Sequence, residues 1–155
     1  MLRRTLLLAF AVGLTATAQK YAGPRPPKAD LPYLKHADNL VPTEAVNAIE
    51  QKKKDDILYV VEGANSTART PLASPIFLLQ AAKLVPERLQ LFKLDAKSDH
   101  REILFSPKHP PKPIRVEVTR LASDLYRIEV SESLEPGEYS LSPEGSNQVF
   151  CFQVF

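Results

Sequence analysis

From residue 57 onward, the chain consists of short apolar runs separated by turn residues. The runs at 114–119 and 126–130 alternate between apolar and charged side chains, which is the two-residue period of a half-buried strand. Most runs begin about 12 residues apart, the spacing of an antiparallel sandwich. We therefore predict an all-β fold, a single antiparallel β-sandwich of seven to eight strands. The eight candidate strands are 57–61, 76–79, 89–94, 102–105, 114–119, 126–130, 139–141 and 149–155.

The alternating runs also predict what their two faces do. Ile114, Val116 and Val118 share one face, which is stable in water only when a second sheet covers it. The opposite face carries Arg115/Glu117 on one strand and Arg127/Glu129 on the next. We expect these opposite charges to pair across the ladder on a solvated face.

The last run places Cys151 between Phe150 and Phe152. Successive side chains of a strand point to opposite faces, so a thiol in the core sends both rings to the other side. Both faces then need cover, which predicts that this strand is central or forms an interface. Because burial disfavours the thiolate, we expect Cys151 to be an inert apolar residue. A reactive or intermolecular thiol is the alternative.

The first 56 residues have a different pattern. Residues 1–18 resemble a secretory signal peptide, with Arg3 and Arg4, an apolar stretch, and a small-residue cleavage site ending at Ala18. Pro-rich residues after it predict an extended linker, and Thr43 is a candidate N-cap for a short charged helix. The expected division is 1–18 signal peptide, 19–56 linker and helix, and 57–155 β-sandwich domain.

Composition restricts the function further. The 155 residues include 20 Lys+Arg, 18 Asp+Glu and a single Cys, so an internal disulfide is excluded. Cleavage after Ala18 would remove two arginines and leave the basic and acidic residues equal in number. A nucleic-acid partner is therefore not expected. No later apolar run has the length of a membrane span, so we expect a secreted or periplasmic protein.

One local motif resembles a known structural feature. Pro136-Gly137-Glu138-Tyr139 resembles the tyrosine corner of immunoglobulin-like sandwiches, in which the Tyr hydroxyl bonds to backbone a few residues upstream. The same pattern is similar to that of transthyretin-like sandwiches. The chain ending also resembles that of exported bacterial proteins of unknown function. This resemblance implies a sandwich, with Pro136, Gly137 and Tyr139 in structural roles, and implies no activity.

No reactive constellation is recognisable in the sequence. The three histidines, His36, His100 and His109, have no metal-ligand spacing to other ligand residues. The chain has neither a Gly-x-Ser-x-Gly elbow nor a Gly-rich phosphate loop. We therefore assign no catalytic, cofactor-binding or metal-binding residue and predict that the protein is not an enzyme.

The predicted function is an exported binding or structural module with an unknown protein or envelope partner. The stiff cationic loop 106–113 is one candidate interaction surface, through Lys108, His109 and Lys112. Aromatic residues of the last strand, Phe152 and Phe155, are another. One alternative is a small exported enzyme or inhibitor that uses loop 106–113 or loop 63–75. A remote alternative is an outer-membrane β-barrel, suggested by the terminal Phe155 but opposed by the short strands and prolines.

Overall fold

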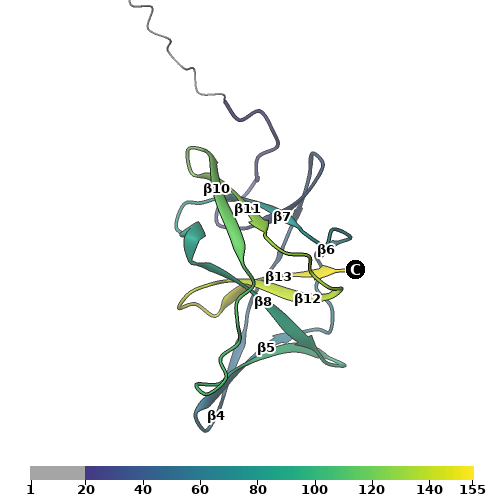
Figure 1. Cartoon of the computed structure of the whole chain (residues 1–155), viewed down its shortest axis with the longest axis vertical. Helices are drawn as coiled ribbons and strands as arrows, with labels where there is room; N and C mark the ends of the chain where they lie inside the picture. Colours follow the sequence, from purple (N-terminus) through teal and green to yellow (C-terminus); the bar gives the residue numbers. More distant parts are fainter. Residues whose placement is uncertain (1–19) are drawn as a thin grey trace, which may run out of the picture.

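The computed structural model describes residues 20–155, which form two β-sheets packed against each other (Figure 1). The helical content of this range is one 3-10 turn, Pro86–Arg88. The first sheet has five strands in the order β10-β11-β7-β1-β2. Their bounds are β10 Val116–Ala122, β11 Leu125–Val130, β7 Ile76–Gln80, β1 Tyr33–His36 and β2 Asn39–Pro42.

The second sheet has eight strands. Seven follow the path β3-β13-β12-β8-β9-β5-β4, and the short β6 pairs with β13 in parallel, whereas the other pairings are antiparallel. Their bounds are β3 Glu44–Asn47, β4 Ile49–Lys53, β5 Asp56–Glu62, β6 Arg69–Thr70, β8 Leu89–Ala96, β9 His100–Phe105, β12 Gly137–Pro143 and β13 Gln148–Val154.

The second sheet is a half-barrel. Its two outermost strands, β3 and β4, are consecutive segments of one stretch of chain, yet β3 pairs with β13 and β4 pairs with β5. Between them, Ala48 donates its backbone N–H to the Asn147 carbonyl at 2.7 Å. The chain at Ala48 therefore joins the two ends of the strand path, and the sheet encloses an inner space that we call the lumen.

The larger hydrophobic core lies between the two sheets. Val116 and Val118 pack against this core, as their alternation predicts. Burial of each such large apolar side chain contributes about 1.5–3 kcal/mol relative to exposure. The most deeply buried members come from both sheets: Leu34, Phe77, Leu79, Leu91, Ile128, Leu141, Phe150 and Phe152.

Strand β13 is covered on both faces, as predicted. Phe150 and Phe152 belong to the core between the sheets, whereas Cys151 belongs to a second, smaller apolar cluster in the lumen. Strand β12 divides in the same way, because Tyr139 and Leu141 join the main core while Ser140 between them faces the lumen. The all-β, two-sheet prediction is thus confirmed, but the fold has more strands than predicted and one sheet is a half-barrel.

The predictions for residues 19–56 are partly wrong. The helix expected after Thr43 is instead β3 and β4, and the Thr43 hydroxyl donates to the Pro32 carbonyl at 2.7 Å. The linker expected up to residue 42 includes β1 and β2, and β1 pairs with β7. Strand pairing with distant segments outweighs local propensity here.

The expected cross-strand ion pairs also differ. The register places Glu117 opposite Glu129 and Thr119 opposite Arg127. Arg127 instead lies 4.0 Å from Glu129 of its own strand. The alternation identifies the solvated face correctly, but the partners on that face are set by the hairpin register.

The predicted signal peptide and its cleavage after Ala18 lie outside the described residues. Within residues 20–155, no helix has the length and apolar character needed to cross a membrane.

Candidate functional site

The lumen is lined by alternate residues of the half-barrel strands, and it has two different ends. In β12, Glu138, Ser140 and Ser142 share the inward face. On β8 the residues opposite them are Leu94, Phe92 and Gln90. One end of the lumen therefore receives carboxylates and the other receives hydroxyls and an amide, with apolar side chains between.

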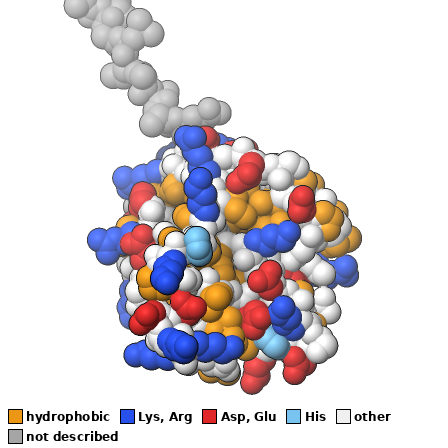
Figure 2. Space-filling view, turned by 60° about the horizontal axis from the view of Figure 1, so that its bottom comes forward, with side chains coloured by type: hydrophobic (Ala, Val, Ile, Leu, Met, Phe, Trp, Pro, Cys, Tyr) orange, Lys and Arg blue, Asp and Glu red, His pale blue; other side chains and the backbone are white. Residues whose placement is uncertain are grey.

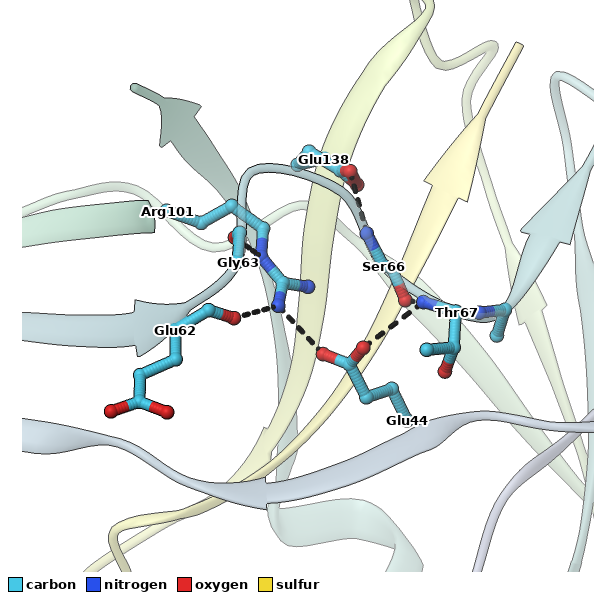
Figure 3. Close-up of polar contacts among 8 residues, drawn as sticks. Glu44, Glu62, Gly63, Ser66, Thr67, Arg101 and Glu138 are labelled. Carbon is cyan, nitrogen blue, oxygen red and sulfur yellow. Dashed lines mark hydrogen bonds and ion pairs between the residues drawn. The ribbon is translucent and has the colours of Figure 1, made fainter. Parts of the chain in front are cut away.

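The closed end is built around Arg101 of β9, whose side chain is only 1% exposed. Its Nε donates to the Gly63 carbonyl at 2.7 Å, and its Nη2 donates to the Glu62 carbonyl at 2.7 Å and to Glu44 Oε1 at 2.7 Å. Figure 3 shows the guanidinium group between these partners. Charge-assisted hydrogen bonds of this kind are roughly twice as strong as neutral ones.

Two lumen carboxylates fasten the loop between β5 and β6 over this end. Glu44 Oε2 accepts the Thr67 N–H at 3.0 Å, and Glu138 Oε1 accepts the Ser66 N–H at 2.8 Å (Figure 3). The Ser66 hydroxyl in turn accepts the Ala68 N–H at 3.2 Å. Loop 63–68 therefore closes one end of the lumen through hydrogen bonds from its backbone.

The closed end has two carboxylates and one guanidinium group in nearly buried positions. Burial raises the pKa of Glu138, and this effect outweighs the opposing hydrogen bond from Ser66 and the charge of Arg101. Within the described residues, Arg101 Nη1 and Glu138 Oε2 are buried without a hydrogen-bond partner. Burial thus disfavours the ionised form of Glu138 relative to that of an exposed glutamate.

The opposite end of the lumen is an open cavity of about 150 Å³. Its wall is aromatic, since Phe105 makes edge contacts with Tyr59 at 5.2 Å and with Phe92 at 5.4 Å between ring centroids. Ala48 and Val149 contribute small aliphatic surface on the opposite side. This cavity is thus an apolar recess that opens from the lumen to solvent.

Polar groups also line the cavity. The Ser140 and Ser142 hydroxyls lie 3.1 Å apart, and both residues line the cavity. Gln90 and the turn 143–147 complete the rim. An apolar recess with a few convergent polar groups is the usual form of a small-ligand site.

The Cys151 thiol belongs to the lumen and not to the surface. It is fully buried, and burial raises its pKa to about 12. A thiol with such a pKa carries almost no thiolate at neutral pH. Its position agrees with the predicted inert role.

The tyrosine-corner motif has its expected hydrogen bond. The Tyr139 hydroxyl donates to the Glu135 carbonyl at 2.7 Å. Gly137 begins β12 after Pro136, which is exposed. These residues therefore hold the entry to β12, and they do not line the cavity.

The predicted interaction residues lie in separate places. Phe152 is fully buried between the sheets, so it cannot form part of a surface, whereas Phe155 is 54% exposed with the Arg69 guanidinium 4.2 Å from its ring centroid. Lys108, His109 and Lys112 are exposed in the Pro-rich loop. Lys108 also lines a surface hollow with Lys53, Lys54, Asp55 and Asp56, which loop and hairpin bring together only in the fold.

The histidines serve local contacts. His100 is held between Asp99 at 2.7 Å and Glu102 at 3.1 Å on the outside of β9, and hydrogen bonds from its ring to these two carboxylates raise the pKa of the ring. His36 Nε2 lies 2.8 Å from the Thr70 hydroxyl. Among residues 20–155, no group of three or more His, Cys, Asp or Glu side chains could hold a metal ion.

Sequence reasoning missed the lumen. One local pattern indicates it. Arg101, Ile103 and Phe105 are alternate residues of one strand and therefore share a face, so the arginine places a charge among inward apolar side chains. The cavity itself needs residues from five strands and one turn, so no local pattern describes it.

In comparisons with family models, with curated proteins and with solved structures, the chain gave no significant match.

Proposed function

We propose that this protein is an exported, non-catalytic binding module, and that the open end of the half-barrel receives one apolar group of its ligand. The observation that carries the proposal is the cavity of about 150 Å³ lined by Tyr59, Phe92 and Phe105. The tyrosine corner at Tyr139 supports an immunoglobulin-like relationship, in which a β-scaffold carries a binding site.

The size of the cavity indicates what fits. An enclosed apolar cavity of about 150 Å³ holds a benzene-sized molecule. The ligand group is therefore a single aromatic ring or a branched aliphatic chain. Its polar part would remain at the mouth, near Ser142 and Gln90, where hydrogen-bonding groups are available.

The chemistry of the cavity favours binding over reaction. Its hydroxyls, from Ser140 and Ser142, lie within hydrogen-bonding distance of each other, whereas an activated hydroxyl nucleophile is hydrogen-bonded to a base. The ionisable groups inside the lumen are engaged at the closed end, where Arg101 and Glu44 hold loop 63–68. The cavity thus offers shape and apolar contact rather than an activated nucleophile.

Indole provides a direct test. The chain has no Trp, so the fluorescence of added indole can be followed without tryptophan fluorescence from the protein. We expect a saturable blue shift as indole leaves water. The substitution Ala48→Leu, which fills the cavity, should abolish the shift. Ala73→Leu, at an exposed position, should leave it unchanged.

Amide chemical shifts identify the location. Saturable changes should gather at Tyr59, Phe92 and Phe105 and spare the five-stranded sheet. If indole gives no saturable change at millimolar concentration, or gives the same change in Ala48→Leu, the cavity is not a ligand site.

A further inference from the structure

The lining of the cavity contains one charged group that the proposed function does not use. β8 and β9 pair only next to their hairpin turn, so they are apart where Phe92 and Phe105 line the cavity. The turn between β12 and β13 contributes residues 143–147 to the lining. Within the described part of the chain, the lining residues include one acidic residue, Glu144, and no lysine, arginine or histidine. The cavity therefore carries a single carboxylate.

The backbone fixes where Glu144 lies. Its N–H donates to the Arg88 carbonyl, immediately before β8 begins, at 3.3 Å. At the other end of the turn, the Asn147 carbonyl accepts the Ala48 N–H at 2.7 Å. Gly145 between them has a φ of 72°, a conformation that glycine adopts without strain. The turn is thus attached at both ends, which keeps Glu144 at the cavity.

The Glu144 carboxylate is available to a ligand. Glu144 is exposed, and in the range 20–155 its carboxylate makes no ion pair. Lys53, Lys54 and Lys108 line a separate hollow, which shares no residue with the cavity and also contains two aspartates. Figure 2, which brings forward the end with the β4–β5 hairpin, shows side chains of both charges interspersed with apolar surface. Because neither sign dominates this end, the charge at the cavity itself decides which ligand it attracts.

The neutral groups of the cavity also suit a cation. The faces of aromatic rings attract cations, and three aromatic rings belong to the lining. An ammonium group has three N–H donors, for which the Ser142 hydroxyl oxygen and the Gln90 amide oxygen are acceptors. Because hydroxyl and amide groups can also donate to an anion, the carboxylate of Glu144 decides the sign of the charge that the cavity prefers.

We propose that the cavity binds an organic amine, with an aromatic or branched aliphatic group inside and an ammonium group on a short flexible chain at Glu144. The ammonium group pairs with the carboxylate at the solvated mouth, while the apolar group displaces water from the aromatic wall. An anion of the same shape meets repulsion from Glu144 and should bind more weakly. This inference rests on the proposed function, since it names the chemical class of the ligand that the same cavity receives.

Three compounds with the same ring test the sign of the charge. Indole is neutral, tryptamine carries an ammonium group on a short chain, and indole-3-propionate carries a carboxylate on a chain of the same length. Titrations of the full chain at low salt, followed by the amide chemical shifts of Phe92 and Phe105, give the three dissociation constants. Because a solvent-exposed ion pair contributes little, we expect tryptamine to bind about fivefold more tightly than indole-3-propionate. High salt should reduce this preference.

Protein variants show whether Glu144 makes the difference. Glu144→Gln keeps the shape of the side chain and removes its charge, so the preference for tryptamine over indole-3-propionate should fall below about twofold. Glu117→Gln, at an exposed position on the five-stranded sheet, is the matched control and should keep the full preference. Equal binding of the two charged compounds by the unaltered protein, or an unchanged preference in Glu144→Gln, overturns this inference. If indole fails to bind the unaltered protein, the proposed function itself is overturned.

Discussion

The two ends of the half-barrel lumen are built from the same strands but carry different inward side chains. At one end, Arg101 and two glutamates occupy inward positions, and their hydrogen bonds bring loop 63–68 over the opening. At the other end, inward hydroxyls and aromatic rings leave a cavity of about 150 Å³. The difference is made by inward residue type, since the strands pass through both ends.

This contrast shows how stability and binding are divided. A buried charge has to be paired, so the closed end is rigid and intolerant of change. A hydroxyl or an aromatic ring edge that is in contact with water loses much less free energy when it has no partner in the protein. The open end can therefore remain unfilled in the folded protein, which a ligand site requires.

Loss of Arg101 should have the largest effect. Arg101→Met leaves Glu44 and two backbone carbonyls without their donor, and breaking a buried pair from one side costs about 3–5 kcal/mol of unfolding free energy. Urea unfolding measures this loss. Arg115→Met, at an exposed position, should change the free energy by less than about 0.5 kcal/mol.

A second substitution keeps this test informative even when Arg101→Met folds poorly. In the double variant, Glu44→Gln removes the carboxylate charge that Arg101→Met leaves without its partner. The double variant should therefore recover part of the lost unfolding free energy. Equal losses from Arg101→Met and Arg115→Met would mean that the closed end contributes nothing special to stability.

Glu138 should make stability depend on pH. Its folded pKa is raised by burial, so its contribution is complete below the unfolded value of about 4.3 and is lost as pH rises through the folded value. The unfolding free energy of the protein should therefore fall relative to that of Glu138→Gln as pH increases from about 4. Urea midpoints measured across this range provide the test.

The matched control for Glu138 is Glu135→Gln, because the Glu135 side chain is 83% exposed. The unfolding free energy of the unaltered protein should not fall with pH relative to that of Glu135→Gln. A difference between Glu138→Gln and the unaltered protein that stays constant with pH would contradict a raised pKa of Glu138.

Tyr139→Phe tests a neutral hydrogen bond. Tyr139 follows Glu138 on β12, and its side chain lies on the opposite face of that strand. The substitution removes the hydroxyl that donates to the Glu135 carbonyl and should cost about 1 kcal/mol of unfolding free energy. Tyr126→Phe, on a half-buried ring of β11, should cost less. A loss as large as that of Arg101→Met would remove the distinction between the charged end and ordinary polar contacts.

The sequence predicted those parts of the fold that have a local period. Strands β7, β10 and β11 lie within three residues of the predicted runs because their apolar faces meet the main core. Strand β4 was missed because all five of its residues are exposed, so it has no apolar alternation. It exists because its backbone pairs with β5.

The site was less predictable because it is made by register and not by local pattern. Ala48, between β3 and β4, is distant along the chain from Phe92 of β8 and Phe105 of β9, and the gap beside the two rings arises where the β8–β9 ladder ends. No residue type marks such an end. Asp30 is a similar case: its carboxylate accepts N–H groups of Ala82, Lys83 and Leu84, which ties the Pro-rich segment to a loop 52 or more residues away.

Labelling of Cys151 tests the open end without any change in the free energy of unfolding, and it defines where that end stops. A pKa of about 12 leaves about one thiol in ten thousand ionised at pH 8, so iodoacetamide should label the folded protein at least about a thousandfold more slowly than the protein in urea. The cavity is lined by Val149 of the same strand but not by Cys151. Slow labelling therefore indicates that the thiol keeps its buried, apolar surroundings in the folded protein. Labelling of the folded protein at the rate seen in urea would mean that the lumen is open to the level of Arg101, and the two ends would then be one channel.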